Sequence, residues 1–150
     1  MSDFEIRPAA KNDVPAIVAM LADDALGNQR ESPDDLSPYL AAFDVLASDP
    51  HQNLVVAVRE GKVVGTLQLT VIPGLSRRGT VRSVIEAVRV HAEERGNGLG
   101  TRLIEWAVEE SERRGCRLVQ LTSDVKRADA HRFYERLGFV ASHVGFKKSL

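Results

Sequence analysis

The residues best suited to chemistry begin with a glycine-rich turn. The turn runs Arg95-Gly96-Asn97-Gly98-Leu99-Gly100 and is followed by Thr101. Before it, Val88 and Val90 alternate with Arg89 as in a strand, and after it apolar residues recur at helical spacing. The first N–H groups of a helix have no intrahelical acceptor and carry partial positive charge, and glycines let an anion approach them. The sequence therefore predicts a phosphate-binding turn between a strand and a helix.

Two common nucleotide-binding loops do not match this turn. A dinucleotide-binding loop would need a third glycine where Thr101 stands, and no early strand-helix-strand unit precedes the turn. A Walker loop would need Gly-Lys followed by Ser or Thr, and no such tripeptide follows the glycines. By composition alone, the turn can equally be a tight connection that binds nothing.

A second group of chemically capable residues lies near the end of the chain. Ala130, Phe133, Tyr134 and Leu137 recur at helical spacing, and Gly138 follows them as a C-terminal cap would. A tyrosine phenol is one of the groups that can act as a general acid. Taken alone, a tyrosine on an apolar stripe is more often a core residue whose hydroxyl is satisfied.

Together the two segments resemble the GNAT superfamily of N-acetyltransferases. The first carries the pattern Arg/Gln-x-x-Gly-x-Gly/Ala of that family's acyl-CoA pyrophosphate loop. The second, Ala130-His131-Arg132-Phe133-Tyr134-Glu135-Arg136-Leu137-Gly138-Phe139, is similar to the family segment whose tyrosine points its hydroxyl at the CoA sulfur. By this resemblance, Tyr134 would be the catalytic acid that protonates the thiolate as it leaves. The segments stand in the family's order, and the resemblance covers essentially all of residues 1–150 as a single domain.

The resemblance implies a mixed α/β (α+β) fold and an activity. The fold would have a central, mostly antiparallel mixed sheet of about six or seven strands, splayed at the glycine-loop strand and flanked by about four helices. The activity would be an N-acetyltransferase, an acyltransferase that moves an acetyl group from acetyl-CoA to a primary amine of a small molecule or peptide. Transfer would be direct, in a ternary complex, with acetyl-CoA as co-substrate and no metal. A non-catalytic acyl-CoA-binding or sensing domain is the alternative.

The resemblance also assigns contacts to acetyl-CoA. Val88 and Val90 would offer main-chain groups to the pantetheine arm. The pyrophosphate would be surrounded by Arg95, Gly96, Asn97, Gly98, Gly100 and Thr101. The family often has an asparagine on that arm seven residues before the tyrosine, where this chain has Arg127. Either Ser123, Asp124 or the backbone replaces it, or the arm is held differently.

Glu86 is the carboxylate that we expect beside the amine. It stands four residues before Val90, and the period of two along a strand would put both side chains on one face. As a general base it could take the ammonium proton directly or through a water. Pairing with an arginine, or binding the substrate cation without proton transfer, stays an equal alternative.

Residues for the acceptor are expected in two segments, 23–39 and 73–79, which the resemblance places around the amine site. The first is mainly acidic but carries Arg30, and the second carries Arg77 and Arg78. An acceptor with both an ammonium group and a carboxylate or phosphate would match these charges. Solvated surface charge is the commoner meaning of such residues.

Composition limits the partners. The chain has 150 residues and a formal net charge of −1, which argues against a strongly electrostatic nucleic-acid or membrane partner. The sequence contains one cysteine, Cys116, so no internal disulfide or cysteine-cluster metal site is expected. The first residues do not resemble a signal peptide, so we expect a cytoplasmic protein. Dimers are frequent in the family, so the resemblance also implies a homodimer.

The elements that must position these residues alternate along the chain. A short strand and a capped helix open it, and a second helix carries a stripe from Leu36 to Leu46. A hairpin turns at Glu60-Gly61-Lys62, joining strands at residues 54–58 and 63–72. The expected elements that follow are a strand at 80–90, a helix from 98 to about 113, a strand at 117–122, a helix near 130–137, and one or two closing strands within 139–147.

Overall fold

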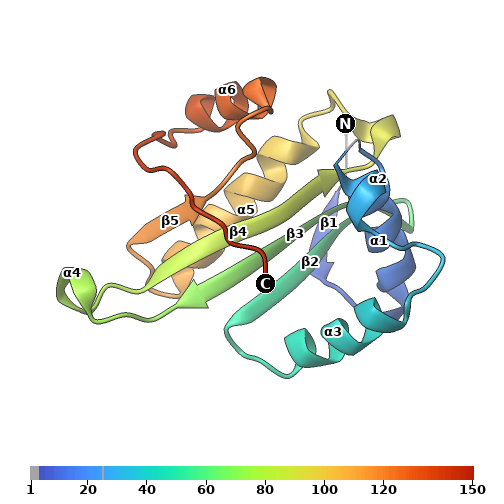
Figure 1. Cartoon of the computed structure of the whole chain (residues 1–150), viewed down its shortest axis with the longest axis horizontal. Helices are drawn as coiled ribbons and strands as arrows, with labels where there is room; N and C mark the ends of the chain where they lie inside the picture. Colours follow the sequence, from blue (N-terminus) through green and yellow to red (C-terminus); the bar gives the residue numbers. More distant parts are fainter. Residues whose placement is uncertain (1–3, 25) are drawn as a thin grey trace.

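A five-stranded sheet in the order β1-β2-β3-β4-β5 organises the computed structural model, which describes residues 4–24 and 26–150 (Figure 1). The first four strands are antiparallel, and β4 pairs in parallel with β5. The strands are β1 (Glu5–Pro8), β2 (Gln52–Arg59), β3 (Lys62–Ile72), β4 (Arg82–Val90) and β5 (Leu118–Leu121). The helices are α1 (Val14–Ala22), α2 (Gly27–Arg30), α3 (Ser37–Ala47), α4 (Ser76–Gly79), α5 (Leu99–Arg113) and α6 (Ala128–Arg136).

The hairpin between β2 and β3 confirms the predicted turn. Glu60 and Gly61 both have positive φ, 51° and 76°, which is the geometry of a two-residue turn matched to the twist of the strands. Arg59 and Lys62 close the pair on either side of it. The register that this turn sets brings the apolar residues of β2 and β3 to the faces of the sheet that are covered.

The core lies between the sheet and α5. Leu99 and Leu103 of α5 are 1% and 0% exposed and pack on the central strands. A Cβ on Gly65 of β3 would lie 3.1 Å and 3.2 Å from these two leucine side chains, so the glycine permits close packing of helix on sheet. Full burial of each leucine stabilises the fold by roughly 1.5–3 kcal/mol. On the other side, α1 contacts β3 and β4, and α3 contacts β2.

The sheet opens between β4 and β5, as the resemblance implied. The two strands pair only from Arg82 to Ile85, opposite Leu118 to Leu121, while β4 continues to Val90. A β-bulge also lies in this part of β4, where the register with β3 shifts and Ala87 has a φ of 54°. From Glu86 onward, β4 is therefore paired with β3 alone.

The closing strands are a difference from the expectation. The described residues form five strands rather than six or seven, and the segment 139–150 is irregular. Its alternating apolar side chains are mostly exposed; Val144 is 77% and Phe146 93% exposed. An alternating pattern becomes a strand only beside a partner edge, and β5 offers an edge of four residues. Among the described helices, none is long and apolar enough to span a membrane.

Candidate active site

The glycine turn forms the entrance to α5. After β4 the chain makes a short 3₁₀ turn at Ala92–Glu94, and Gly96 and Gly98 then adopt positive φ values of 86° and 80°. The first helical hydrogen bond runs from the Arg102 N–H to the Gly98 carbonyl, at 3.1 Å. The N–H groups of the three preceding residues, Leu99 to Thr101, therefore point out of the helix start without a helical acceptor. This arrangement can bind an oxyanion.

Packing within the protein does not explain why residue 100 is a glycine. Its φ is not positive, and an added Cβ would lie 3.5 Å from the Phe133 ring and 4.0 Å from Val90, which are ordinary contacts. Glycine at a helical position costs about 0.5–1 kcal/mol relative to alanine. The absent side chain leaves room between the helix start, α6 and β4, as close approach of a ligand would require.

Two side chains of the turn have weak partners of their own. The Asn97 amide donates to the Glu94 carboxylate at 3.3 Å, and Arg95 lies 3.8 Å from Asp23. Both members of the Arg95 pair are more than half exposed, so water screens the attraction. Both side chains can reorient toward a bound anion at little cost.

The open edge of β4 begins beside this turn. The His91 N–H donates to the Val64 carbonyl at 2.8 Å, and Val90 stands opposite Gly65. In an antiparallel pair the groups alternate, so the N–H and carbonyl of Val90 point to the opposite edge, where β5 has ended. The Val88 carbonyl already accepts a bond from Arg89 Nη1 at 2.9 Å. Val90 can therefore offer both its main-chain groups to a ligand that lies along β4.

The bulge overturns the expected position of Glu86. Glu86 pairs with Gln68 and Val90 with Gly65, and these two residues of β3 point to opposite faces of the sheet. The extra residue at Ala87 reverses the alternation, so Glu86 shares its face with Arg89 rather than with Val90. Glu86 is exposed there.

Tyr134 is brought to the same region by α6. Its neighbour Phe133 contacts Gly100, so α6 adjoins the glycine turn. The Tyr134 ring packs edge-on against Phe133 and Phe139, with centroids 5.2 Å and 6.1 Å away. Burial raises the pKa of the Tyr134 phenol, and the positive charges of Arg127 and Arg89 oppose that rise. A phenol in this environment stays protonated near neutral pH and can act as an acid.

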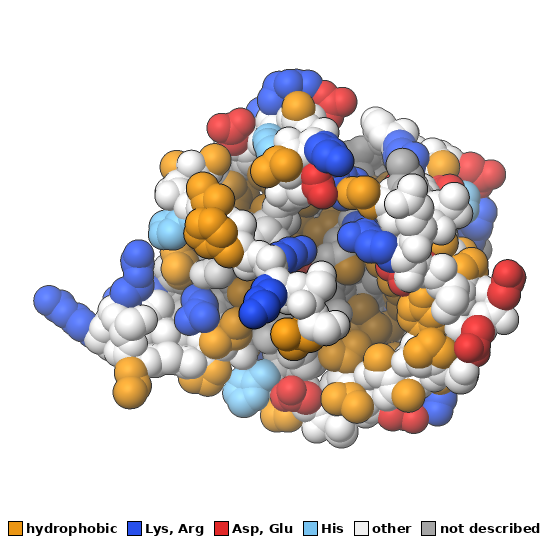
Figure 2. Space-filling model, viewed as in Figure 1, with side chains coloured by type: hydrophobic (Ala, Val, Ile, Leu, Met, Phe, Trp, Pro, Cys, Tyr) orange, Lys and Arg blue, Asp and Glu red, His pale blue; other side chains and the backbone are white. Residues whose placement is uncertain are grey.

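Arg89 is a site residue that the sequence reasoning missed. Its side chain is 14% exposed and its Nε lies 3.5 Å from the Asp24 carboxylate, just after α1. The sequence feature that could have indicated it is a single arginine between two valines of a strand. Figure 2 shows Lys and Arg side chains gathered around the hollow in the middle of this face.

The three predicted acceptor residues are not brought together. Arg30 ends α2, whereas Arg77 and Arg78 form the turn α4 with left-handed φ values of 55° and 61°. α2 and α4 lie near opposite ends of β4 (Figure 1). A strand of nine residues spans about 30 Å, so one small molecule does not reach both ends. Arg77 and Arg78 therefore lie far from the glycine turn, whereas Arg30 lies at the end of β4 that adjoins it (Figure 1).

Other residues with catalytic side chains have structural partners. His91 Nδ1 accepts from the Glu93 N–H at 3.2 Å, and a ring nitrogen of His131 lies 2.9 Å from the Asp124 carbonyl. Cys116 follows the far end of α5, and burial raises the pKa of its thiol, which disfavours the nucleophilic thiolate. Within residues 4–24 and 26–150, no group of three His, Cys, Asp or Glu side chains is placed to hold a metal ion.

Comparison with known proteins matches this site to a family. The model of the acetyltransferase (GNAT) family matches residues 15–139. An aminoalkylphosphonate N-acetyltransferase of Salmonella typhimurium is 33% identical over 97% of this chain and 91% of its own length. An L-methionine sulfoximine/L-methionine sulfone acetyltransferase of Pseudomonas paraeruginosa is 32% identical over 91% of this chain and 80% of its own.

A solved structure is also similar along nearly the whole chain. It is the crystal structure of a protein of Bacillus halodurans C-125 described as a transcriptional regulator, with a TM-score of 0.95 and 44% identity, covering 99% of this chain and 100% of that one. The shared fold, the glycine turn and the match of the family model lead to one conclusion. The chain belongs to the GNAT family of acetyltransferases.

Proposed function

We propose that this acetyltransferase moves an acetyl group from acetyl-CoA to the primary amine of a small molecule or peptide, directly within a ternary complex. One observation carries the proposal: the donors at the start of α5 adjoin the unpaired edge of β4 at Val90, and α6, which carries Tyr134, adjoins the same helix start through Phe133. A pyrophosphate, an extended arm and a thioester need such a sequence of anion donors, strand edge and acid.

Acetyl-CoA is bound by main-chain groups more than by side chains in this proposal. Its pyrophosphate accepts from the first N–H groups of α5, around Gly96, Gly98, Gly100 and Thr101, with Arg95 and Asn97 closing over it. Its pantetheine arm lies along β4 like an added strand and pairs with Val90 and the backbone near Val88. The residues that match the family's motif therefore act together.

The chemical step needs a neutral amine and an acid for the leaving group. The neutral amine nitrogen attacks the thioester carbonyl carbon, and the C–S bond breaks as the tetrahedral intermediate collapses. The leaving thiolate takes a proton from the Tyr134 hydroxyl, and the proton lost by the amine nitrogen returns the tyrosinate to the phenol, directly or through water. The phenol can supply its proton because burial raises its pKa and keeps the hydroxyl protonated until the thiolate forms.

Glu86 is proposed to act on the amine from the other face of β4. Its carboxylate either receives the ammonium proton through a water or binds the cation electrostatically. The register shift at Ala87 lies next to Glu86, and a bulge bends the strand in which it occurs. The two roles of Glu86 make different pH profiles and can be separated by substitution.

Small molecules are the acceptors to test first. The substrates named for the Salmonella and Pseudomonas relatives, aminoalkylphosphonates and methionine sulfoximine or sulfone, combine an amine with an acidic group. The test is release of free CoA thiol from acetyl-CoA across a panel of amines, including aminoalkylphosphonates, amino acids, polyamines and N-terminal peptides. Amine-dependent release with one class is expected, and release that no amine accelerates would refute the proposal.

The second candidate is a domain that binds acyl-CoA without turnover. It is favoured by the description of the Bacillus halodurans protein as a transcriptional regulator. The same panel distinguishes the two functions, because a sensor would be stabilised by acetyl-CoA against heat and release no thiol with any amine.

Two further properties stay predictions. A homodimer would cover the exposed apolar side chains Val140, Val144 and Phe146 of the last segment. Light scattering after size-exclusion chromatography tests this, and a monomer at micromolar concentration would contradict it. A cytoplasmic location is expected and is tested by cell fractionation.

A further inference from the structure

Arg89 is held in an environment that leaves its positive charge only partly compensated. Its Nη1 donates to the Val88 carbonyl at 2.9 Å, but its Nε is buried and has no hydrogen-bond partner among the residues that the structure describes. The facing carboxylate, Asp24, also accepts from the Gly27 N–H at the start of α2. Asp24 is therefore shared between a helix start and the guanidinium. A buried guanidinium with an unmatched donor favours the approach of a second anion.

Two more arginines lie near the Arg89–Asp24 pair. Burial lowers the pKa of Arg89, and the positive charges of Arg127 and Arg30 lower it further. The Gly27 hydrogen bond lowers the pKa of Asp24, and the charges of Arg89, Arg127 and Arg30 add to this effect, so Arg127 and Arg30 lie near the pair. Both side chains are exposed, so a ligand can reach them. Among the described residues, Glu31 is a second carboxylate that acts on Arg89, and it already accepts a hydrogen bond from the Tyr39 hydroxyl at 2.8 Å. Three cations thus face two carboxylates, each of which has another donor.

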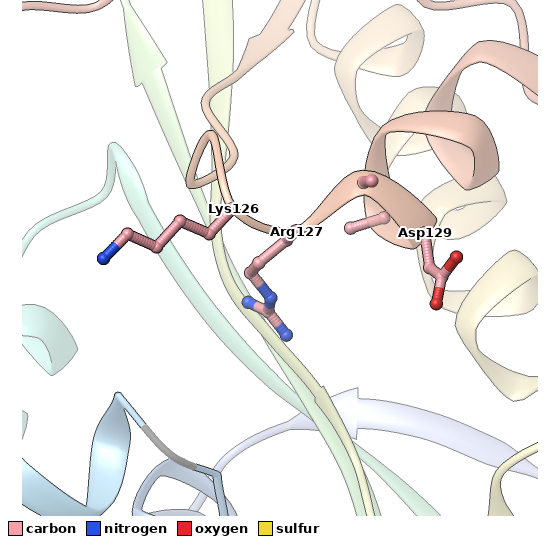
Figure 3. A pocket seen from close by; sticks show the side chains of 5 residues that line it. Lys126, Arg127 and Asp129 are labelled. Carbon is pink, nitrogen blue, oxygen red and sulfur yellow. The ribbon is translucent and has the colours of Figure 1, made fainter.

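The position of Arg127 leaves space for a ligand. A hollow of about 340 Å³ is lined by residues 126–130, at the start of α6. In Figure 3 the Arg127 side chain points toward β4, away from Asp129. Asp129 pairs with Arg132 on α6, so it does not neutralise Arg127. A hollow of this size accommodates a small ligand or part of one.

The cluster is close to the expected point of reaction. Arg127 and Arg89 both lower the pKa of the Tyr134 phenol against the effect of burial, so both charges act on the hydroxyl proposed to protonate the thiolate. The pyrophosphate of acetyl-CoA has its own donors at the start of α5 and does not need these arginines. An anion bound beside Arg89, Arg127 and Arg30 would therefore belong to the acceptor amine.

We infer that Arg89 and Arg127, with Arg30 at the rim, form a subsite for an oxyanion of the acceptor, so that the acceptor is a primary amine that carries a phosphonate, phosphate or carboxylate. Guanidinium groups suit this role because their planar forks bind such oxyanions with two parallel hydrogen bonds. The inference rests on the proposed function, and it moves the anion subsite from Arg77 and Arg78 to the opposite end of β4.

The test compares matched acceptors on the 150-residue chain. 2-Aminoethylphosphonate and β-alanine carry the oxyanion, and propylamine is a neutral amine of similar length. Wild type is expected to prefer an anionic amine in kcat/KM. Arg127→Gln is expected to lower kcat/KM for that amine roughly 10- to 100-fold more than for propylamine, mainly through KM, and to leave the KM for acetyl-CoA within about twofold. Arg132→Gln is the matched control, because Arg132 is exposed on the same helix and pairs with Asp129.

The failures are distinguishable. Wild type that acetylates no amine would refute the proposed function. Wild type that uses propylamine as well as the anionic amines, or an Arg127→Gln variant that loses both equally, would overturn the subsite alone. A raised KM for acetyl-CoA in that variant would assign Arg127 to acetyl-CoA instead.

A measurement on wild type covers the case in which the variant does not fold. Inorganic phosphate is expected to inhibit competitively against the amine and not against acetyl-CoA. Competition against acetyl-CoA, or no inhibition in the millimolar range, would overturn the subsite. Arg127→Lys is expected to restore part of the lost kcat/KM, because the charge returns without the fork.

Discussion

Gly100→Ala tests whether residue 100 is glycine to admit a ligand or to allow packing within the protein. The added methyl group would meet Phe133 at 3.5 Å and Val90 at 4.0 Å, so nothing in the protein must move. Alanine should then hold the native state as well as glycine or stabilise it by up to about 1 kcal/mol, since it restricts the unfolded chain and favours the helix. Denaturant unfolding measures this difference.

Binding of acetyl-CoA should respond in the opposite direction. The methyl group would project into the space between the start of α5, α6 and β4, where we place the junction of pyrophosphate and pantetheine. Loss of one charge-assisted hydrogen bond costs about 1.5–3 kcal/mol, which is roughly a 10- to 150-fold rise in Kd. Calorimetric titration with acetyl-CoA measures this rise.

Gly74→Ala is the matched control for this substitution. A Cβ on Gly74 would also make ordinary contacts, 3.6 Å and 3.7 Å away, but in the loop before β4. Its Kd for acetyl-CoA should stay within about twofold of wild type. An unchanged Kd in Gly100→Ala would refute the binding path, and a large loss of stability would refute the packing argument.

The remaining predictions concern proton transfer and stability. Tyr134→Phe should lower kcat by about 100-fold or more with acetyl-CoA affinity unchanged, and an unaffected kcat would remove Tyr134 from the chemistry. Wild-type activity should not fall in mildly alkaline solution through ionisation of this phenol, because burial raises its pKa above the ordinary value. If Glu86 is the general base, Glu86→Gln should lower kcat/KM and abolish the acidic limb of the pH profile of kcat/KM. A raised KM for the acceptor with that limb retained would assign Glu86 to binding the substrate cation. Cys116→Ala should keep wild-type activity, and an acetylated Cys116 detected by mass spectrometry would contradict direct transfer. Hydrogen bonds from Arg7, in an ion pair at 2.8 Å, lower the pKa of Asp13. The stabilisation from this pair is therefore present above the ordinary aspartate pKa of about 3.9 and is lost as the pH falls through the lower native value. The melting temperature of Asp13→Asn should depend less on pH in acid than that of wild type.

Local chemistry made the glycine turn and the hairpin predictable. Gly96 and Gly98 adopt the positive φ that their type allows, and Glu60-Gly61 turns where the pattern of strands required. The opening of β4 was also expected, but from the resemblance rather than from any residue pattern.

The bulge at Ala87 is what sequence reasoning could not supply. Alanine with a φ of 54° carries no signal of its own, because the register with β3 imposes that conformation. One extra residue reversed the face of Glu86 and turned Arg89 toward Asp24. The sequence therefore did not predict that Arg89, Arg127 and Arg30 lie close together.

The irregular last segment has a similar origin. The alternation of residues 139–147 is typical of a strand, but hydrogen bonds to a neighbouring edge are needed to form one. Such pairing depends on what lies beside the segment, which is a tertiary property and is not encoded locally.

The central claim is that acetyl-CoA lies across the start of α5 and along the open edge of β4. Backbone ¹H–¹⁵N NMR of the full chain during titration with acetyl-CoA tests this claim most directly. The amide resonances of Val90 and of Gly96 to Thr101 are expected to shift most and to gain protection from hydrogen exchange. Saturating acetyl-CoA that leaves these amides unchanged, or shifts only residues far from them, would contradict the account.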